Sequence, residues 1–242
     1  MAAGTPLRIH ICPVSYEIDR VVLPLLKLKA DEAILVTKRT SPEKDKAKKY
    51  IERIQSMLKV HDIPFKMLQC DLDDFHDCLL VVSSAIKKER DQGNLVFVNI
   101  STGGRVLSHA ASIAGMMHEA SLYYAVPESD EREEREVTHG VSRILPMPSF
   151  RIEPPEEELL DCLDVLKKAG GSLRKREFIE HLRERGLVST RSTKSQAIYG
   201  VAKRLCRPLI ERGWVEEEGR TRAMVVRLSS EGERVLRGAR GP

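Results

Sequence analysis

The amino-acid sequence predicts an α/β fold: a Rossmann-like, mostly parallel sheet, followed by a C-terminal winged helix-turn-helix domain. Up to residue 126, short apolar stretches alternate with longer amphipathic ones, which is the rhythm of strands and helices in a parallel sheet covered on both faces. Further on, three amphipathic stretches precede two β-like stretches that are joined by a glycine turn. That order of elements is typical of a winged helix. A cluster of prolines lies between the two parts.

Strands and helices alternate through the first part. Residues 95–99 are apolar up to their last residue, as expected of a strand at the centre of a parallel sheet. Asp19 is a candidate N-cap, and Pro42 suits the first turn of a helix. Residues 141–145 form a candidate for one more strand. The predicted strands are residues 7–12, 33–37, 63–68, 95–99 and 121–126, and the predicted helices are residues 19–29, 41–61, 72–90 and 107–120.

The proline cluster predicts the domain boundary. Prolines stand at positions 146, 148, 154 and 155, where few contacts would cross between two cores. We therefore expect one domain over residues 1–150 and a second over residues 151–242. A highly charged run at residues 128–136 is interpreted as a solvated connection.

The second part contains helices first and strands later. The third helix is capped by Ser192 or Thr193, and we expect it to run to about Cys206 and to stop near Pro208. A closing helix starts at Ser230. The other predicted helices are residues 156–168 and 173–185, and the predicted strands are residues 214–217 and 224–228, joined by a turn at residues 218–221.

Charge is distributed unevenly between the two parts. Residues 1–150 hold 20 Lys and Arg against 21 Asp and Glu, whereas residues 151–242 hold 20 against 15. The basic excess of the chain therefore belongs to the second part. An asymmetry of this kind suggests that the second part faces nucleic acid.

Composition excludes several classes of protein. No apolar run in the 242 residues approaches the roughly 18 that a transmembrane helix needs, and the N-terminus lacks a signal-peptide pattern, so neither a membrane span nor secretion is expected. The dispersed histidines suggest no metal site, and no cofactor is expected. The cysteines are odd in number and form no CxxC pair, which favours reduced, mostly buried thiols in a cytoplasmic protein. They are Cys12, Cys70, Cys78, Cys162 and Cys206.

The third helix of the second part presents a polar and basic face. Apolar residues recur at helical spacing on its other side, including Leu205 and Leu209. The face contains residue types that contact phosphates and base edges when a helix enters the major groove of double-stranded DNA, and two arginines on the hairpin would reach the DNA backbone or minor groove. The candidates are Ser195, Gln196, Tyr199, Lys203 and Arg207 on the helix, and Arg220 and Arg222 on the hairpin. The alternatives are a solvated basic face and a protein-binding winged helix. Within the same fold, the winged helices would otherwise serve mainly for dimer contacts.

A glycine pair follows the predicted central strand. In the stretch Asn99-Ile100-Ser101-Thr102-Gly103-Gly104-Arg105, the two glycines allow positive φ and close approach to a ligand where a strand turns into a helix. The N–H groups of residues 102–105 would cradle phosphates, and Arg105 adds charge. The stretch has no GxGxxG pattern and no Walker lysine, so it suggests a nucleotide-like ligand without naming one. A tight turn without a ligand is the alternative.

A second loop is expected at the same edge of the sheet. In open parallel sheets, ligands bind outside the carboxyl ends of the strands. The loop after the first strand, residues 13–19, ends at that edge, and its Ser15 and Tyr16 would contact a sugar or a base.

The combination resembles the archaeal CARF-domain winged-helix regulators, which are CRISPR-associated Rossmann-fold sensors. The resemblance covers the architecture of the whole chain. Its specific part is small: the apolar strand leading into the polar-Gly-Gly-polar turn, and the loop after the first strand. That loop departs from the family's usual small, polar turn because it carries Pro13 and Tyr16.

The resemblance implies a function. In that family the Rossmann domain forms a homodimer, and the two copies of these loops make one pocket for a cyclic oligoadenylate, often the tetra-adenylate. It therefore implies a ligand-responsive transcription regulator of antiviral defence. The implied ligand contacts are Ser15, Tyr16, Ser101, Thr102, Gly103, Gly104 and Arg105.

Two other functions stay open. Some CARF domains slowly cleave their ring ligand, and Ser15, Ser101 and Arg105 would be placed to assist, but no general base stands out and no catalytic residue is assigned. The other alternative is a dimeric repressor that senses a different phosphorylated metabolite.

Overall fold

The structure is a computed structural model that describes residues 5–40, 45–128, 138–152, 155–188, 200, 202–219 and 223–240. The chain divides into two compact units, Met1–Glu153 and Pro154–Pro242. Within the described residues, no helix is both long and apolar enough to cross a membrane.

The first unit is built around one six-stranded sheet with the strand order β3-β2-β1-β4-β5-β6. The first five strands are parallel, and β6 runs antiparallel to β5 at the edge. This confirms the predicted Rossmann-like, mostly parallel sheet. Its elements are β1 (Arg8–Pro13), α1 (Asp19–Lys27), β2 (Glu32–Lys38), α2 (Lys48–Val60), β3 (Phe65–Cys70), α3 (Phe75–Asp91), β4 (Leu95–Asn99), α4 (Arg105–Met117), β5 (Ser121–Val126) and β6 (Arg143–Pro146).

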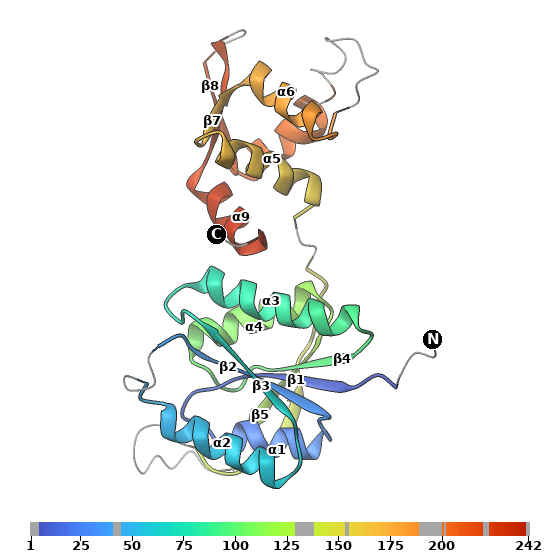
Figure 1. The fold of residues 1–242 in the computed structure, drawn as a ribbon, viewed down its shortest axis with the longest axis vertical. Coiled ribbons are helices and arrows are strands. Elements are labelled where there is room, and N and C mark those ends of the chain that lie inside the picture. Colours follow the sequence, from blue (N-terminus) through green and yellow to red (C-terminus); the bar gives the residue numbers. More distant parts are fainter. Residues whose placement is uncertain are drawn as a thin grey trace. The chain divides into compact units, whose positions relative to one another are not determined.

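Helices cover both faces of this sheet, with α1 and α2 on one side and α3 and α4 on the other (Figure 1). Successive side chains of β2 point to opposite faces of the sheet, so this strand contributes to both cores. Ile34 and Val36 pack beneath α3 and α4, whereas Ala33 and Leu35 pack beneath α1 and α2. Both faces are apolar because both are covered, so the central strands read as continuous hydrophobic runs.

Helix starts in this unit differ in detail from the sequence prediction. Asp19 is not the N-cap of α1, because its carboxylate accepts the Gly140 N–H at 2.8 Å and Ile18 occupies the cap position. The second helix begins only at Lys48, after Asp45 accepts the Ala47 N–H at 2.9 Å in a local turn. Pro42 lies outside the described residues.

The second unit surrounds a core of its own, which includes Phe178, Leu163 and Leu209. Its three strands form an antiparallel sheet in the order β7-β9-β8. The elements are α5 (Glu157–Lys168), β7 (Ser172–Arg174), α6 (Lys175–Glu184), the π-helix η1 (Ala202–Cys206), α8 (Arg207–Glu211), β8 (Val215–Glu218), β9 (Val225–Leu228) and α9 (Ser230–Arg240).

Two predictions for this unit were wrong in detail. The start of the predicted helix at residues 173–185 is the short strand β7, which gains its partners from β9, more than fifty residues away in the sequence. The third helix does not stop near Pro208 but continues to Glu211. The π-helix η1 ends at Cys206, and Pro208 lies in the first turn of the α-helix α8 that follows it directly.

The five cysteines are buried and free, as predicted for reduced thiols.

Candidate functional site

The sheet of the first unit has its topological switch point between β1 and β4. The chain builds outward from β1 through β2 to β3, then returns to β4 on the other side of β1 and continues to β5. β1 and β4 are parallel and in register from Arg8 against Leu95 to Ile11 against Val98. Their carboxyl ends therefore bring the loop after Pro13 and the glycine loop together, at the place where open α/β sheets bind ligands.

The glycine pair is required by the backbone. Gly103 has a φ of +93°, and a Cβ there would lie 2.3 Å from the Cβ of Pro13. Gly104 has a φ of +80° and a ψ of 166°, a conformation that is essentially restricted to glycine, but a Cβ there would meet nothing within 4 Å. Gly103 thus brings the two loops into contact, whereas Gly104 lies in open space at the start of α4.

Side chains of the glycine loop hold its shape. The Ser101 Oγ accepts the Ala125 N–H at 2.6 Å, and the Thr102 hydroxyl donates to the carbonyl of Pro13. Thr102 is buried, so its hydroxyl ties the glycine loop to the end of β1. The hydroxyls of these two predicted ligand-binding residues are therefore engaged in hydrogen bonds within the protein.

Asn99 is a site residue that the sequence prediction did not include. Its buried side chain accepts the Ser101 N–H at 2.9 Å and donates to the carbonyl of Arg20 at 2.8 Å. One amide thus connects the end of β4, the glycine loop and the first turn of α1. A polar residue at the end of an apolar strand was the signal for it in the sequence.

The N-terminus of α4 is open. Gly104 provides no side-chain cap, and Gly104, Arg105 and Val106 are exposed. The first N–H groups of a helix have no partner within it and carry the positive end of the helix dipole. An anion can therefore bind there through backbone amides, with the Arg105 side chain nearby in the sequence.

Of the two residues predicted on the first loop, the structure brings Ser15 to the glycine pair. The Gly103 N–H points to the Ser15 Oγ at 3.4 Å, a long contact. Tyr16 instead packs its ring edge-on against Tyr50 of α2, with 5.4 Å between ring centroids.

A buried polar group lies below the switch point. His10 stacks on Phe97 at 4.7 Å, and its Nδ1 lies 3.2 Å from the Tyr123 hydroxyl. Burial lowers the pKa of His10 to about 4, and burial raises the pKa of the neighbouring Cys12 thiol to about 12. At neutral pH the histidine is uncharged and the thiol is protonated, so Cys12 is not poised as a thiolate nucleophile.

Most of the predicted DNA contacts lie outside the described residues. These are Ser195, Gln196, Tyr199, Arg220, Arg222 and the side chain of Lys203. Arg207 is described and exposed, and its Nε donates to Glu211 Oε1 at 2.7 Å. That hydrogen bond raises the pKa of Arg207 and partly neutralises the residue's contribution to a cationic surface.

The positive excess of the second part has a definite place in the sequence. Its residues 189–203 and 220–222 contain five basic residues and no carboxylate, whereas the rest of residues 151–242 holds 15 basic and 15 acidic residues. The five are Arg191, Lys194, Lys203, Arg220 and Arg222. In the sequence they stand at the predicted third helix and between β8 and β9.

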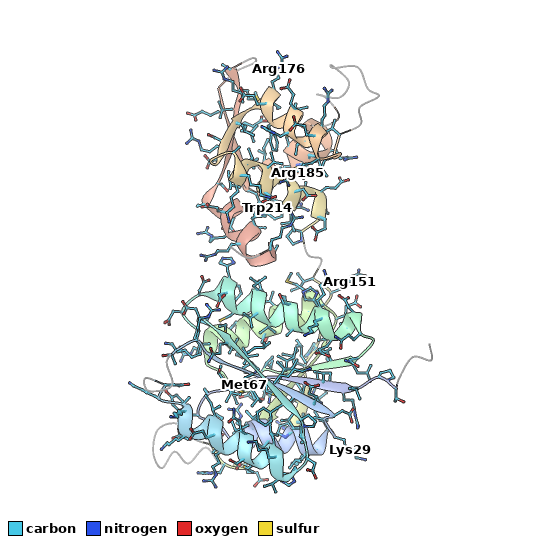
Figure 2. All side chains as sticks on the ribbon, in the orientation of Figure 1. Lys29, Met67, Arg151, Arg176, Arg185 and Trp214 are labelled. Carbon is cyan, nitrogen blue, oxygen red and sulfur yellow. The ribbon has the colours of Figure 1, made fainter. Side chains whose placement is uncertain are left out.

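Described cations elsewhere in this unit are largely paired. Figure 2 shows the side chains of the unit, among them Arg176 and Arg185. Arg176 Nε lies 3.2 Å from Glu180, and Arg185 Nη1 lies 2.8 Å from Asp164. Further pairs join Lys175 to Glu217, Arg204 to Glu158, Arg212 to Glu156 and Arg227 to Glu218.

A groove in this unit does not alter the conclusion that its described cations are largely paired. It measures about 510 Å³ between α5 and α8 and is lined by Glu156, Arg204 and Arg212 among others. The charges of these residues are already matched in the ion pairs above, so the groove presents no unpaired charge of either sign from them.

The fold defines a Rossmann-like unit with an exposed, uncapped helix start at its switch point, joined in one chain to a second unit of helices and an antiparallel sheet. The family model described as HFX_2341_N:-like, N-terminal matches residues 8–130, which is half of the chain, and the chain belongs to this family. Residues 158–240 match the model of the DUF6293 C-terminal winged helix domain, which confirms the predicted winged helix.

Relatives are found in archaea. An uncharacterized protein of Methanocaldococcus jannaschii is 24% identical over an alignment of 189 residues, and the match covers 67% of this chain and 56% of that protein. An uncharacterized protein of Archaeoglobus fulgidus is 21% identical over 131 residues, which are 54% of each. The chain spans about half the length of the curated relatives that it matches.

Solved structures with a similar arrangement include two that hold cyclic nucleotides. Can2 of Sulfobacillus thermosulfidooxidans, in complex with cyclic tetra-adenylate, matches with a TM-score of 0.44 and 11% identity over 96% of this chain and 64% of that chain. Enterococcus italicus Csm6, bound to cyclic hexa-2′-fluoro-hexa-dAMP, matches with a TM-score of 0.44 and 9% identity over 86% of this chain and 56% of that chain.

Proposed function

We propose that this protein is a DNA-binding transcription regulator that senses a cyclic oligoadenylate at the switch point of its first unit. The observation that carries the proposal is the glycine loop. Because Gly103 has no Cβ, the loop packs closely against Pro13, and Gly104 leaves the N-terminus of α4 uncapped and exposed. A nucleotide phosphate would be bound by those amides, with Ser15 and Arg105 as side-chain contacts. The identity of the nucleotide follows from the resemblance to the CARF-domain regulators.

The regulator half of the proposal concerns the second unit. Its winged helix family and its carboxylate-free basic segments favour binding to the phosphates and grooves of duplex DNA. In this proposal the protein acts in the cytoplasm, which fits its five free, buried cysteines.

The proposed mechanism is a population shift in a homodimer. One ring would bind across the two copies of the glycine loop and favour one relative placement of the two winged helices. The ring changes DNA affinity only if it binds the two arrangements unequally. Ligand affinity and DNA affinity are then reciprocally linked.

The ligand half is tested by calorimetric titration of the full chain with cyclic tetra-adenylate, with linear tetra-adenylate as the control. We expect binding of the cyclic compound, with one ring per two chains. The products after long incubation are separated as well, because linear fragments would identify ring cleavage instead of sensing alone. No heat at high protein concentration would reject the cyclic oligoadenylate.

The DNA half is tested by fluorescence anisotropy with duplex DNA from upstream of the protein's own gene, over a series of salt concentrations. We expect affinity to fall steeply as salt rises, and to change when the ring is saturating. Absence of binding at low salt would reject the DNA-binding role, and equal affinity with and without the ring would reject the coupling.

A further inference from the structure

Arg20 is a buried cation beside the glycine loop. It lies in the first turn of α1 and is only 8% exposed. Its Nε donates to the carbonyl of Ala125 at 2.9 Å, and its guanidinium lies 4.9 Å from the centroid of the Tyr124 ring. α1 and the end of β5 thus enclose a full positive charge.

The charge of Arg20 is only partly matched. Its nearest carboxylate among the described residues is Glu17, whose Oε1 lies 4.0 Å from Nη1. The other oxygen of Glu17 already accepts hydrogen bonds from the N–H and the hydroxyl of Thr138. Nη2 is buried and has no hydrogen-bond partner in the part of the chain that the structure describes. A buried charged donor without a partner is costly, because it has lost water without gaining an acceptor.

Arg20 and the glycine loop meet at one residue of β5. The N–H of Ala125 bonds the Ser101 Oγ, and the carbonyl of Ala125 bonds the Arg20 Nε. The N–H and C=O of one strand residue point to the same side of the strand. That side is the one that β4 occupies until Asn99, so the guanidinium and the glycine loop share the space beyond the end of β4.

We propose that Arg20 is a phosphate-binding residue of this site and that its Nη2 group takes a phosphate oxygen of the ligand. The assignment of that phosphate to a nucleotide rests on the proposed function. A guanidinium binds phosphate through paired, charge-assisted hydrogen bonds, and these are stronger where water is excluded. Together with the open amides of α4, Arg20 gives the site a positive donor on a second element.

Glu17 and Thr138 lie beside this guanidinium. Thr138 is buried, and two residues that follow it are fixed to α1 by further contacts, Gly140 N–H to Asp19 and Lys27 Nζ to the carbonyl of Val141. Since Nη2 is shielded from solvent, a phosphate needs the protein to open locally, and in this proposal the contact between Glu17 and Thr138 is the one that opens. The phosphate then takes the place of the Glu17 carboxylate beside the guanidinium.

The proposal makes two opposite predictions for anion binding by the full chain. Arg20→Lys retains the charge but loses the fork of the guanidinium, and we expect it to weaken binding of both sodium pyrophosphate and cyclic tetra-adenylate about tenfold or more. Thr138→Val removes the hydroxyl contact to Glu17, and we expect it to strengthen binding of the same probes. Arg8→Lys is the matched control, because the Arg8 guanidinium is already paired with Asp31 at 3.1 Å. We expect this variant to bind both probes with the affinity of the unaltered chain.

The outcomes separate this inference from the proposed function. If cyclic tetra-adenylate binds equally well to the unaltered chain and to Arg20→Lys, the inference is wrong and the proposed ligand stands. If only pyrophosphate binds, and binding depends on Arg20, the inference stands and the proposed ligand is wrong. Binding of neither probe to the unaltered chain rejects both.

A measurement without substitution covers the case in which Arg20→Lys does not fold. In the ¹⁵N-labelled unaltered chain, the guanidinium resonances of Arg20 are followed by NMR during titration with pyrophosphate. We expect a shift of the Nε–H and Nη–H signals and slower exchange of the Nη protons. Unchanged signals at saturating pyrophosphate would overturn the proposal.

Discussion

The switch point of the first unit and the polar surfaces of the second unit use their side chains differently. At the switch point, Ser101 and Thr102 are engaged with the protein itself, and what is open is backbone at the start of α4. In the second unit, described cations are mostly paired, and the excess charge is concentrated in two short sequence segments. The difference suggests that binding at the first unit depends on backbone shape, whereas binding at the second depends on unmatched charge.

The largest effect is expected from the glycine pair, which tests the dependence on backbone shape. Gly103→Ala adds a Cβ 2.3 Å from the rigid ring of Pro13 at a positive φ, so strain and overlap together should lower the free energy of unfolding by about 4 kcal/mol. Gly104→Ala is the matched control: it shares the positive φ but has open space, and it should cost only about 1–3 kcal/mol. The measurement is urea denaturation followed by circular dichroism.

Equal losses in the two variants would contradict this view, because they would mean that contact between the two loops does not decide the shape of the site. Both variants should also bind any switch-point ligand more weakly than the unaltered chain, even at low salt.

The next effect concerns pH and distinguishes the cores of the two units. The pKa of His10 is lowered to about 4 by burial, so between pH 6.5 and 4 the unfolded chain binds a proton that the folded chain does not. Stability is therefore full above pH 6.5 and falls as the pH drops, by about 2 kcal/mol at pH 5. Burial also lowers the pKa of His118, which acts in the same direction.

The second unit should respond less, because its one histidine, His181, is exposed. The single tryptophan, Trp214, lies in that unit, so its fluorescence reports on the second unit, while tyrosine absorbance reports chiefly on the first. We expect the urea midpoint to fall between pH 7.5 and pH 5 in the tyrosine signal and to change less in the tryptophan signal. The variant His10→Gln should flatten the pH dependence of the tyrosine signal, and an unchanged slope would count against His10 as its source.

The smallest effect on stability is expected in the second unit, where a cation in an ion pair can be compared with a cation from a sequence segment that lacks carboxylates. Arg207→Ala removes an exposed cation paired with Glu211, so it should leave the free energy of unfolding almost unchanged and hardly alter the salt dependence of DNA binding. Arg222→Ala removes a cation from a segment without carboxylates, and it should reduce the slope of log affinity against log salt by about one. Equal reductions in slope for the two variants would show that ion pairing does not separate them.

The sequence alone was sufficient for the local parts of the fold. Strands over residues 95–99 and 121–126 were predicted with the bounds that the structure has, because a buried strand reads as an apolar run whatever its neighbours are. The glycine pair was predicted to turn a strand into a helix with positive φ, and both glycines do so. The confirmed winged helix likewise follows from the order of its helices and strands.

Only the tertiary structure decided which side chains remain available at the site. Thr102 bonds a carbonyl 89 residues away, Asn99 one 79 residues away and Arg20 one 105 residues away, and no local pattern marks such pairs. Strand order is the physical reason: placing β4 beside β1 brings distant segments to one edge, where buried polar groups must find partners. The sequence by itself determined where the backbone turns, and the packing of the sheet determined that two of the predicted hydroxyls are engaged within the protein and that Arg20 keeps a donor without a partner among the described residues.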